Sequence, residues 1–248
     1  MNYLLLKEDK YSLQSPFLFN FYLELSNFIS QRKETDLDIE EMRQLFLASP
    51  ITINVEDYGA GSKKVNSKIR QVSEITRYST SSRKFAQLYQ YFCSLTPAET
   101  VVELGTCMGL TSRYLSRISL GTTYTIEGSE EILSVAKAIG ETGNIEFING
   151  KINEALGQIL QKVDKVDFAL IDANHTYSGT IDAYRQIRSK IQPTSILAIG
   201  DIHWSSEMET AWKEIIRSEE VKLSLDFFEC GIIFFDAPIT KANYILHY

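Results

Sequence analysis

The chain has 248 residues, of which 44% are hydrophobic and 23% charged, as in an ordinary globular protein with one large domain or a core and an appendage. Its net charge of −7 disfavours nucleic acid as a partner, because neutralising phosphates requires a basic surface. No apolar run approaches the roughly 20 residues that span a membrane, and the first residues do not resemble a signal peptide. We therefore expect a cytoplasmic protein whose three distant cysteines are reduced thiols.

The N-terminal part of the chain is predicted to be mainly helical. Apolar side chains recur every three or four residues in four stretches, residues 15–30, 36–48, 66–79 and 82–95. A short strand is expected over residues 51–55, followed by a polar, glycine-containing loop over 56–64. We interpret residues 1–95 as a helical cap or lid, with this loop contacting the substrate.

From residue 96 onward, strand-like and helix-like runs alternate. The strand-like runs are residues 100–104, 123–127, 145–149, 166–172 and 195–201, and each is followed by a helical pattern. This alternation predicts a parallel sheet covered by helices on both faces. Residues 221–238 hold two more strands joined at Cys230-Gly231, and this short connection requires antiparallel pairing. The sequence therefore predicts an α/β fold, a doubly wound and mostly parallel sheet over residues 96–248 that ends in an antiparallel hairpin.

The first of these strands ends in a glycine-containing turn, in the stretch VVELGTCMGL. In a doubly wound sheet, ligands bind at the carboxyl ends of the strands. Gly105 permits a sharp turn, Gly109 allows a ligand to approach the backbone, and Glu103 is an acid that needs a donor when buried. By itself, this pattern fits a ligand-binding turn and an ordinary strand-to-helix turn equally well.

A second acid, Glu127, ends the next strand in the stretch YTIEGSEE. A carboxylate at this position is placed to accept hydrogen bonds from ribose hydroxyls, although it could also cap the following helix. The glycine pattern of dinucleotide-binding proteins is absent, and no phosphate-binding lysine follows the turn. A nucleoside ligand without phosphates therefore fits better than a dinucleotide.

Four stretches in this order resemble class I S-adenosylmethionine-dependent methyltransferases: VVELGTCMGLTS, YTIEGSEE, VDFALIDANHTY and SILAIGDIHWSSEMETAW. The chain is most similar to the catechol O-methyltransferase-like branch, and within it to a bacterial group of unassigned substrate. The resemblance covers roughly residues 80–237, and the upstream SPFLFNFY and DYGAGS are similar to the same group. It implies a Rossmann-like methyltransferase fold with S-adenosylmethionine as the cofactor.

The resemblance also implies where the cofactor lies. Its methionine part would be held by the turn after the first strand, its ribose by the second strand, its adenine by the third, and its sulfonium would face the fourth. The residues that match these positions are Glu103, Gly105, Thr106, Gly109 and Thr111, then Glu127, then Gly150 and Asn153, and finally Asp172.

Candidate catalytic residues lie in the two loops that follow the fourth and fifth strands. His175 falls where catechol-type enzymes carry their catalytic lysine, and an imidazole suits removal of a proton from an acceptor hydroxyl or amine. Asp172 would orient the acceptor, and His203 is the second candidate histidine. The alternatives are a structural histidine at 175 and a loop-packing histidine beside Trp204 at 203.

A metal ion stays an open alternative. Catechol-type enzymes hold Mg²⁺ with an Asp after the fourth strand and an Asp-Asn pair after the fifth, and here Gly200-Asp201 replaces that pair. Asp172 and Asp201 alone offer few oxygen ligands for Mg²⁺, whereas Asn174 or His175 could complete a site for a softer ion.

These observations favour S-adenosylmethionine-dependent methyl transfer to a small-molecule acceptor, on oxygen. We expect no nucleic acid and no membrane as partners, and a homodimer remains open. Two alternatives from other classes also remain. One is a non-catalytic cofactor-binding or assembly module on the same fold, and the other is a dinucleotide-dependent oxidoreductase, which the missing glycine pattern disfavours.

Overall fold

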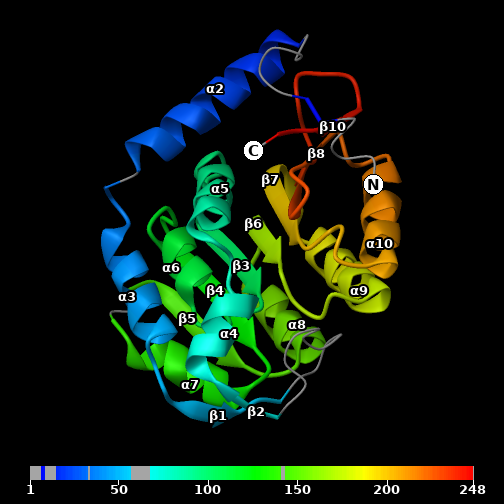
Figure 1. The fold of residues 1–248 in the computed structure, drawn as a ribbon. Coiled ribbons are helices and arrows are strands. Elements are labelled where there is room, and N and C mark those ends of the chain that lie inside the picture. The colour runs from blue at the N-terminus through cyan, green and yellow to red at the C-terminus, as the bar shows by residue number, and fades with distance from the viewer. Residues whose placement is uncertain (1–6, 9–14, 33, 57–67, 141–142, 248) are drawn as a thin grey trace.

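The computed structural model describes residues 7–8, 15–32, 34–56, 68–140 and 143–247. Within these residues, eight strands form one sheet in the order β10-β8-β9-β7-β6-β3-β4-β5 (Figure 1). Their bounds are β3 Thr100–Leu104, β4 Thr122–Glu127, β5 Ile145–Asn149, β6 Val166–Ile171, β7 Ile191–Gly200, β8 Leu223–Asp226, β9 Cys230–Phe234 and β10 Ala242–Ile245.

The strand directions confirm the predicted mostly parallel sheet. Strand β3 pairs in parallel with β4 on one side and with β6 on the other, and β6 pairs in parallel with β7. Strand β9 is antiparallel to both β7 and β8, which confirms the predicted hairpin. Its connection is residues 227–229, and Cys230-Gly231, where the sequence analysis placed it, begins β9. The carboxyl ends of β3, β4, β6 and β7 therefore meet at one edge, where the site is expected.

Strand β10 is an element that the sequence analysis missed. It pairs in parallel with β8, and its outer edge receives a single bridge from Glu8, whose N–H donates to the carbonyl of Ile245 at 2.7 Å. His247, the histidine beyond the two candidate loops, has an exposed side chain, and its backbone N–H donates to the carbonyl of Glu8 at 2.8 Å. The strand is only four residues long and follows no helix, so neither length nor alternation signals it.

Successive side chains of each central strand point to opposite faces of the sheet, and helices cover both faces. Val102 and Leu104 of β3 lie in a core cluster with three helices, whereas Val101 lies in a second cluster on the opposite face. The first face is covered by α8 Ile152–Lys162, α9 Tyr177–Arg188 and α10 Ser206–Arg217. The other carries α5 Arg83–Ser94 and α6 Leu110–Ser116, with α7 Glu130–Ala138 beside β4 and β5.

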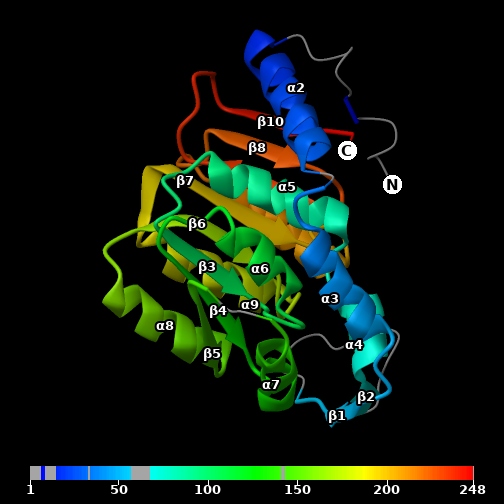
Figure 2. The ribbon, with the colours of Figure 1, turned by 90° about the vertical axis from the view of Figure 1, so that its left-hand side faces the viewer.

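The remaining N-terminal elements form a layer outside α5, α6 and α7 (Figure 2). Helix α2 (Pro16–Gln31) packs on α5, and helix α3 (Leu37–Leu47) packs on α4 (Val72–Ser79). The predicted strand is present as β1 (Thr52–Asn54). The expected helix over 66–79 is wrong in its first part, because residues 69–71 form β2, which pairs antiparallel with β1.

The loop that we expected to contact substrate, over residues 56–64, lies outside the described residues apart from Glu56. Among the described helices, none combines the length and apolar character needed to cross a bilayer.

The packing of Gly231 against Trp212 provides a test of how the antiparallel strand β9 is fixed to α10. A Cβ atom at Gly231 would lie 2.4 Å from the Trp212 ring. We expect Gly231→Ala to lower the free energy of unfolding by about 1–3 kcal/mol, because the indole must move within a filled core. Urea unfolding measures this change.

The matched control for this substitution is Gly157→Ala in α8. A Cβ atom there would meet nothing closer than 3.9 Å, so alanine should leave stability unchanged or raise it by up to about 1 kcal/mol. Equal midpoints for the two variants would contradict the packing described for β9.

Candidate active site

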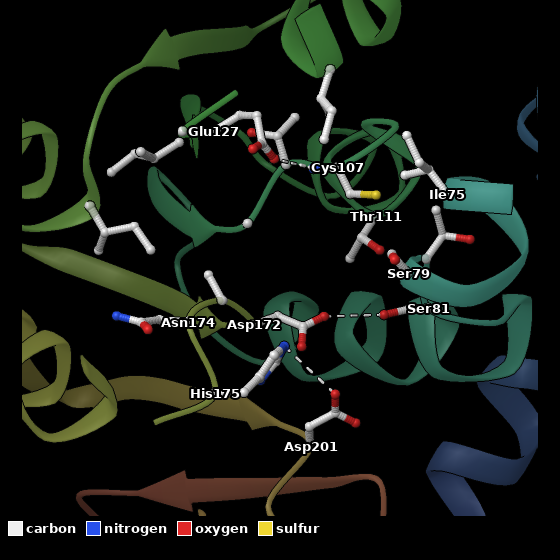
Figure 3. A pocket seen from close by; sticks show the side chains of 18 of the residues that line it. Ile75, Ser79, Ser81, Cys107, Thr111, Glu127, Asp172, Asn174, His175 and Asp201 are labelled. Carbon is white, nitrogen blue, oxygen red and sulfur yellow. Dashed lines mark hydrogen bonds and ion pairs between the residues drawn. The ribbon is translucent and has the colours of Figure 1, made fainter. Parts of the chain in front are cut away.

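A cavity of about 1000 Å³ lies at the carboxyl ends of β3, β4, β6 and β7. The turns after these strands form one side of it, and the connection between α4 and α5 forms the other (Figure 3). Eight of the predicted site residues line it, namely Gly105, Thr106, Thr111, Glu127, Gly150, Asn153, Asp172 and His175, and so does Asp201. Glu103, Gly109 and His203 are not among its lining residues.

The turn after β3 has the backbone shape that its glycines permit. Gly105 has φ +101°, and a Cβ atom there would lie 2.3 Å from the backbone oxygen of Asp172. The N–H groups of Gly105 and Thr106 both donate to the carbonyl of Ile126, at 3.0 and 3.1 Å. Gly109, with φ +66°, is the N-cap of α6. The turn is thus fixed against β4 and β6, the two neighbours of β3.

Glu127 is held rigidly at the end of β4. Its Oε2 accepts a hydrogen bond from the N–H of Cys107 at 2.9 Å, and its Oε1 accepts one from the N–H of Ser129 at 3.0 Å. Ser129 is the N-cap of α7, so the carboxylate does brace the start of a helix, as the alternative interpretation expected. It also lines the cavity, where a carboxylate can accept a hydrogen bond from a ligand hydroxyl.

Glu103 differs from expectation, because it lies beneath the turn and does not reach the cavity. The side chain is 1% exposed and accepts hydrogen bonds from Ser112 and, at 2.6 Å, from Thr125. Burial raises the pKa of Glu103 to about 8, although both hydroxyl donors act in the opposite direction. Its position on the α6 side of the sheet follows from the alternation along β3. Glu103 therefore supports the turn from below.

Three titratable side chains meet at the other end of the cavity (Figure 3). Asp172, His175 and Asp201 each offer one atom within 4.8 Å of the others. His175 Nε2 lies 3.6 Å from Asp201 Oδ2, and Ser81 Oγ donates to Asp172 Oδ2 at 3.4 Å. Burial raises the pKa of Asp172, whereas His175 and Ser81 lower it. The arrangement can orient an acceptor, accept its proton or bind a cation.

The backbone around these three residues is unusual. Asn174, His175 and Asp201 have φ values of 70°, 46° and 54°, in the left-handed region that non-glycine residues rarely occupy. Such a conformation costs of the order of 1–3 kcal/mol per residue and persists only where the surroundings impose it. Here the N–H of Asp201 donates to the carbonyl of Glu229 at 2.6 Å, and that of His175 to Ala173 at 2.8 Å. Backbone strain of this kind is concentrated at functional sites.

Gly200 precedes Asp201, and the structure explains why no carboxylate stands there. A Cβ atom at Gly200 would lie 2.0 Å from Asp172 Oδ1 and 2.7 Å from its Cγ. Any larger residue would displace the Asp172 side chain.

His203 lies outside the cavity, which corrects its selection as a candidate catalytic residue. Its Nε2 lies 2.8 Å from Asp226 Oδ2, and its Nδ1 lies 3.5 Å from Glu209 Oε1. The ring stacks on Phe228 with centroids 5.4 Å apart. The Asp226 hydrogen bond raises the pKa of His203, and burial opposes it. This environment matches the loop-packing alternative.

Ser81 and Tyr89 are among the lining residues that the sequence analysis missed. Ser81 lies in the connection between α4 and α5, and Tyr89 lies on α5. Both come from the N-terminal region, where no motif marks a site. The apolar spacing that predicted α5 also makes Tyr89 indistinguishable from a core residue.

Residues 102–202 match the family model described as a methyltransferase domain. This stretch is a methyltransferase domain. It contains the glycine turn, Glu127 and the Asp172–His175–Asp201 cluster, so the family expected from the sequence is confirmed over the part of the chain that carries the site. A search of curated proteins finds no match to the chain.

Solved structures share the fold of the methyltransferase domain. An O-methyltransferase of Bacillus cereus in complex with S-adenosylhomocysteine is 18% identical, with a TM-score of 0.54, covering 63% of this chain and 83% of that chain. TomG of Streptomyces achromogenes, an O-methyltransferase in complex with S-adenosylmethionine, is 16% identical with a TM-score of 0.54, covering 63% and 82%. PaMTH1 of Podospora anserina, a methyltransferase bound to S-adenosylhomocysteine, is 12% identical with a TM-score of 0.57, covering 91% and 100%.

The buried Glu103 of the methyltransferase domain predicts a pH dependence of stability. The folded chain keeps Glu103 protonated up to its pKa of about 8, whereas the unfolded chain loses this proton near 4.5. The contribution of Glu103 to the free energy of unfolding should therefore fall as pH rises from about 4.5 to about 8. Glu103→Gln is neutral and similar in shape, so it should flatten this part of the profile in urea unfolding.

Glu130→Gln is the control, because this exposed glutamate in the first turn of α7 does not line the cavity. It should leave the pH profile of stability unchanged. If Glu103→Gln also reproduces the wild-type profile, Glu103 does not carry the proton assigned to it.

Proposed function

We propose that the chain binds S-adenosylmethionine in this cavity and transfers its methyl group to an oxygen atom of a small-molecule acceptor. The observation that carries the proposal is the juxtaposition, in one cavity of a methyltransferase domain, of Glu127 at one end and the Asp172–His175–Asp201 cluster at the other. The volume of about 1000 Å³ reaches the upper end of the range for small-molecule sites, which leaves room for an acceptor beside a nucleoside cofactor.

The cofactor would extend from β5 to β6 along the carboxyl ends of the strands. Glu127, already fixed by two backbone N–H groups, would accept the ribose hydroxyls. The turn from Gly105 to Thr111 would hold the methionine part, and Gly150 and Asn153 would lie along the adenine. Bound S-adenosylmethionine supplies a methyl group on a sulfonium, so the protein mainly has to position the acceptor for in-line displacement.

The acceptor would lie beside Asp172 and His175. We assign His175 as the general base, because its imidazole lines the cavity and can remove the hydroxyl proton during transfer. Asp201, whose Oδ2 lies 3.6 Å from His175 Nε2, would stabilise the imidazolium that forms. Asp172, held by Ser81, would orient the acceptor hydroxyl.

The same residues fit a divalent cation. Asp172, His175 and Asp201 would hold it, and it would lower the pKa of an acceptor hydroxyl bound to it.

The N-terminal region would form the outer wall of the acceptor site. Described residues of this region that line the cavity include Val55, Arg70 and Ser81. This supports a cap role for residues 1–95, although α5, the last helix of that region, packs directly on the sheet through β6 and β7. The non-catalytic alternative was kept open by Gly200, and the Asp172 side chain provides a physical reason for that glycine.

Cofactor binding is tested by calorimetry with S-adenosylmethionine and S-adenosylhomocysteine. We expect micromolar affinity, and Glu127→Ala should weaken it at least tenfold, or about 1.4 kcal/mol, because the ribose loses its acceptor. Glu130→Ala, in the exposed first turn of α7, is the matched control and should bind like the wild type. A folded wild-type chain that binds neither ligand would favour the non-catalytic module.

The base role of His175 is tested on a panel of catechols, phenols and sugars with metal-free protein. His175→Asn suits the left-handed backbone and removes the base, so we expect kcat to fall by about 10²- to 10⁴-fold. The Kd of S-adenosylmethionine should not change. His203→Asn, outside the cavity, should affect kcat much less. Undiminished turnover by His175→Asn would remove His175 from the reaction.

A further inference from the structure

We propose that Asp172, His175 and Asp201 bind a divalent first-row transition ion, with the imidazole of His175 as the third protein ligand in place of an oxygen donor. The inference rests on the proposed methyl-transfer site and concerns which ion that site selects. One ligand atom from each side chain lies within 4.8 Å of the others, so small side-chain rotations bring all three to one ion.

Gly200 offers no side chain as a third ligand, and its position leaves room for the Asp172 carboxylate. A side chain at 200 would overlap the Asp172 carboxylate, whose Oδ1 lies 2.0 Å from the position of a Cβ atom. Asp201, the next residue, is turned toward the cluster by its left-handed backbone, with φ 54°. Since Gly200 supplies no ligand atom, a third protein ligand comes from another loop.

The loop after β6 supplies it. The successive left-handed residues Asn174 and His175 direct the imidazole toward Asp201. His175 Nε2 is 3.6 Å from Asp201 Oδ2, which is too long for a strong hydrogen bond. Its Nδ1 is a buried atom without a hydrogen-bond partner among the described residues. An imidazole held in this way, at a cost in backbone strain, is suited to ligating an ion.

Charge also favours a cation at this position. Among the described residues, Ser81 donates the hydrogen bond that reaches the Asp172 carboxylate, at 3.4 Å, and Asp201 and Glu229 also line the cavity. Carboxylates that lie close together repel one another unless a cation compensates their charge. A divalent ion between Asp172 and Asp201 supplies that compensation.

The mixed donor set decides which ion is preferred. Mg²⁺ requires oxygen ligands in near-ideal octahedral geometry and keeps most of its water, whereas imidazole favours the later first-row ions. Replacing an oxygen donor by His175 therefore shifts the selectivity toward ions such as Co²⁺. In the ion-bound protein His175 is a ligand, so its role as general base belongs to the ion-free protein.

The experiment is a calorimetric titration of the EDTA-treated full-length chain with Co²⁺ and with Mg²⁺, and the visible spectrum of Co²⁺ reports the ligand set. We expect one Co²⁺ per chain, bound at least tenfold more tightly than Mg²⁺. His175→Asn, which suits the left-handed backbone, should weaken Co²⁺ binding at least tenfold. His175→Asp restores an all-oxygen set and should reduce the preference for Co²⁺ over Mg²⁺.

The control is His203→Asn, because this histidine lies outside the cavity and should leave Co²⁺ binding unchanged. If the variants at 175 fail to fold, Asp201→Asn provides the same test, and melting temperatures establish folding. Absent Co²⁺ binding, equal affinity for Co²⁺ and Mg²⁺, or unaltered Co²⁺ binding in the folded variants would overturn the proposal.

Calorimetry with S-adenosylmethionine on the same samples separates the two proposals. A chain that binds the cofactor but not Co²⁺ loses only the metal site. A chain that binds Co²⁺ but neither cofactor ligand keeps the metal site and loses the proposed function.

Discussion

The position of Asp172 between two glycines is the constraint on which the site depends. Gly105, after β3, leaves room for the backbone oxygen of Asp172, and Gly200, at the end of β7, leaves room for its carboxylate. Strand β6, which Asp172 follows, lies between those two strands. Because both neighbours lack a side chain at the point of contact, the end of β6 can enter the space between them. The glycine turn after β3 and the end of β7 are thereby fixed relative to each other by one residue.

The carboxylates of Glu127 and Asp172 line the same cavity. Glu127 accepts hydrogen bonds from two backbone N–H groups, and the Asp172 carboxylate accepts one from Ser81 at 3.4 Å. Neighbouring negative charges require compensation, which a positively charged ligand can supply. A sulfonium cofactor and a divalent ion meet the same requirement at neighbouring positions. Binding of a cation and stability of the fold are thus linked through the same side chains.

Much of the fold was predictable because its signals are local. Alternating runs predicted the parallel sheet, and the shortness of the connection between the last two strand-like runs predicted the antiparallel pairing. Glu127 and Asp172 could be placed because the carboxyl ends of parallel strands meet. The roles of Glu103 and His203 depend on which way a side chain points, and those of Ser81 and Tyr89 on packing between distant segments. Such features are set by tertiary contacts that single-sequence patterns do not contain.

The short strand β10 has a consequence for the solution behaviour of the protein. An open strand edge exposes unpaired N–H and C=O groups that can recruit a strand from another molecule. Strand β10 covers β8, and Glu8 then occupies part of the outer side of β10 through its bridge to Leu246. The segments at residues 7–8 and 242–247 together protect that margin of the sheet. Loss of either segment would expose a template for intermolecular β-pairing, so aggregation is the expected result of trimming this chain.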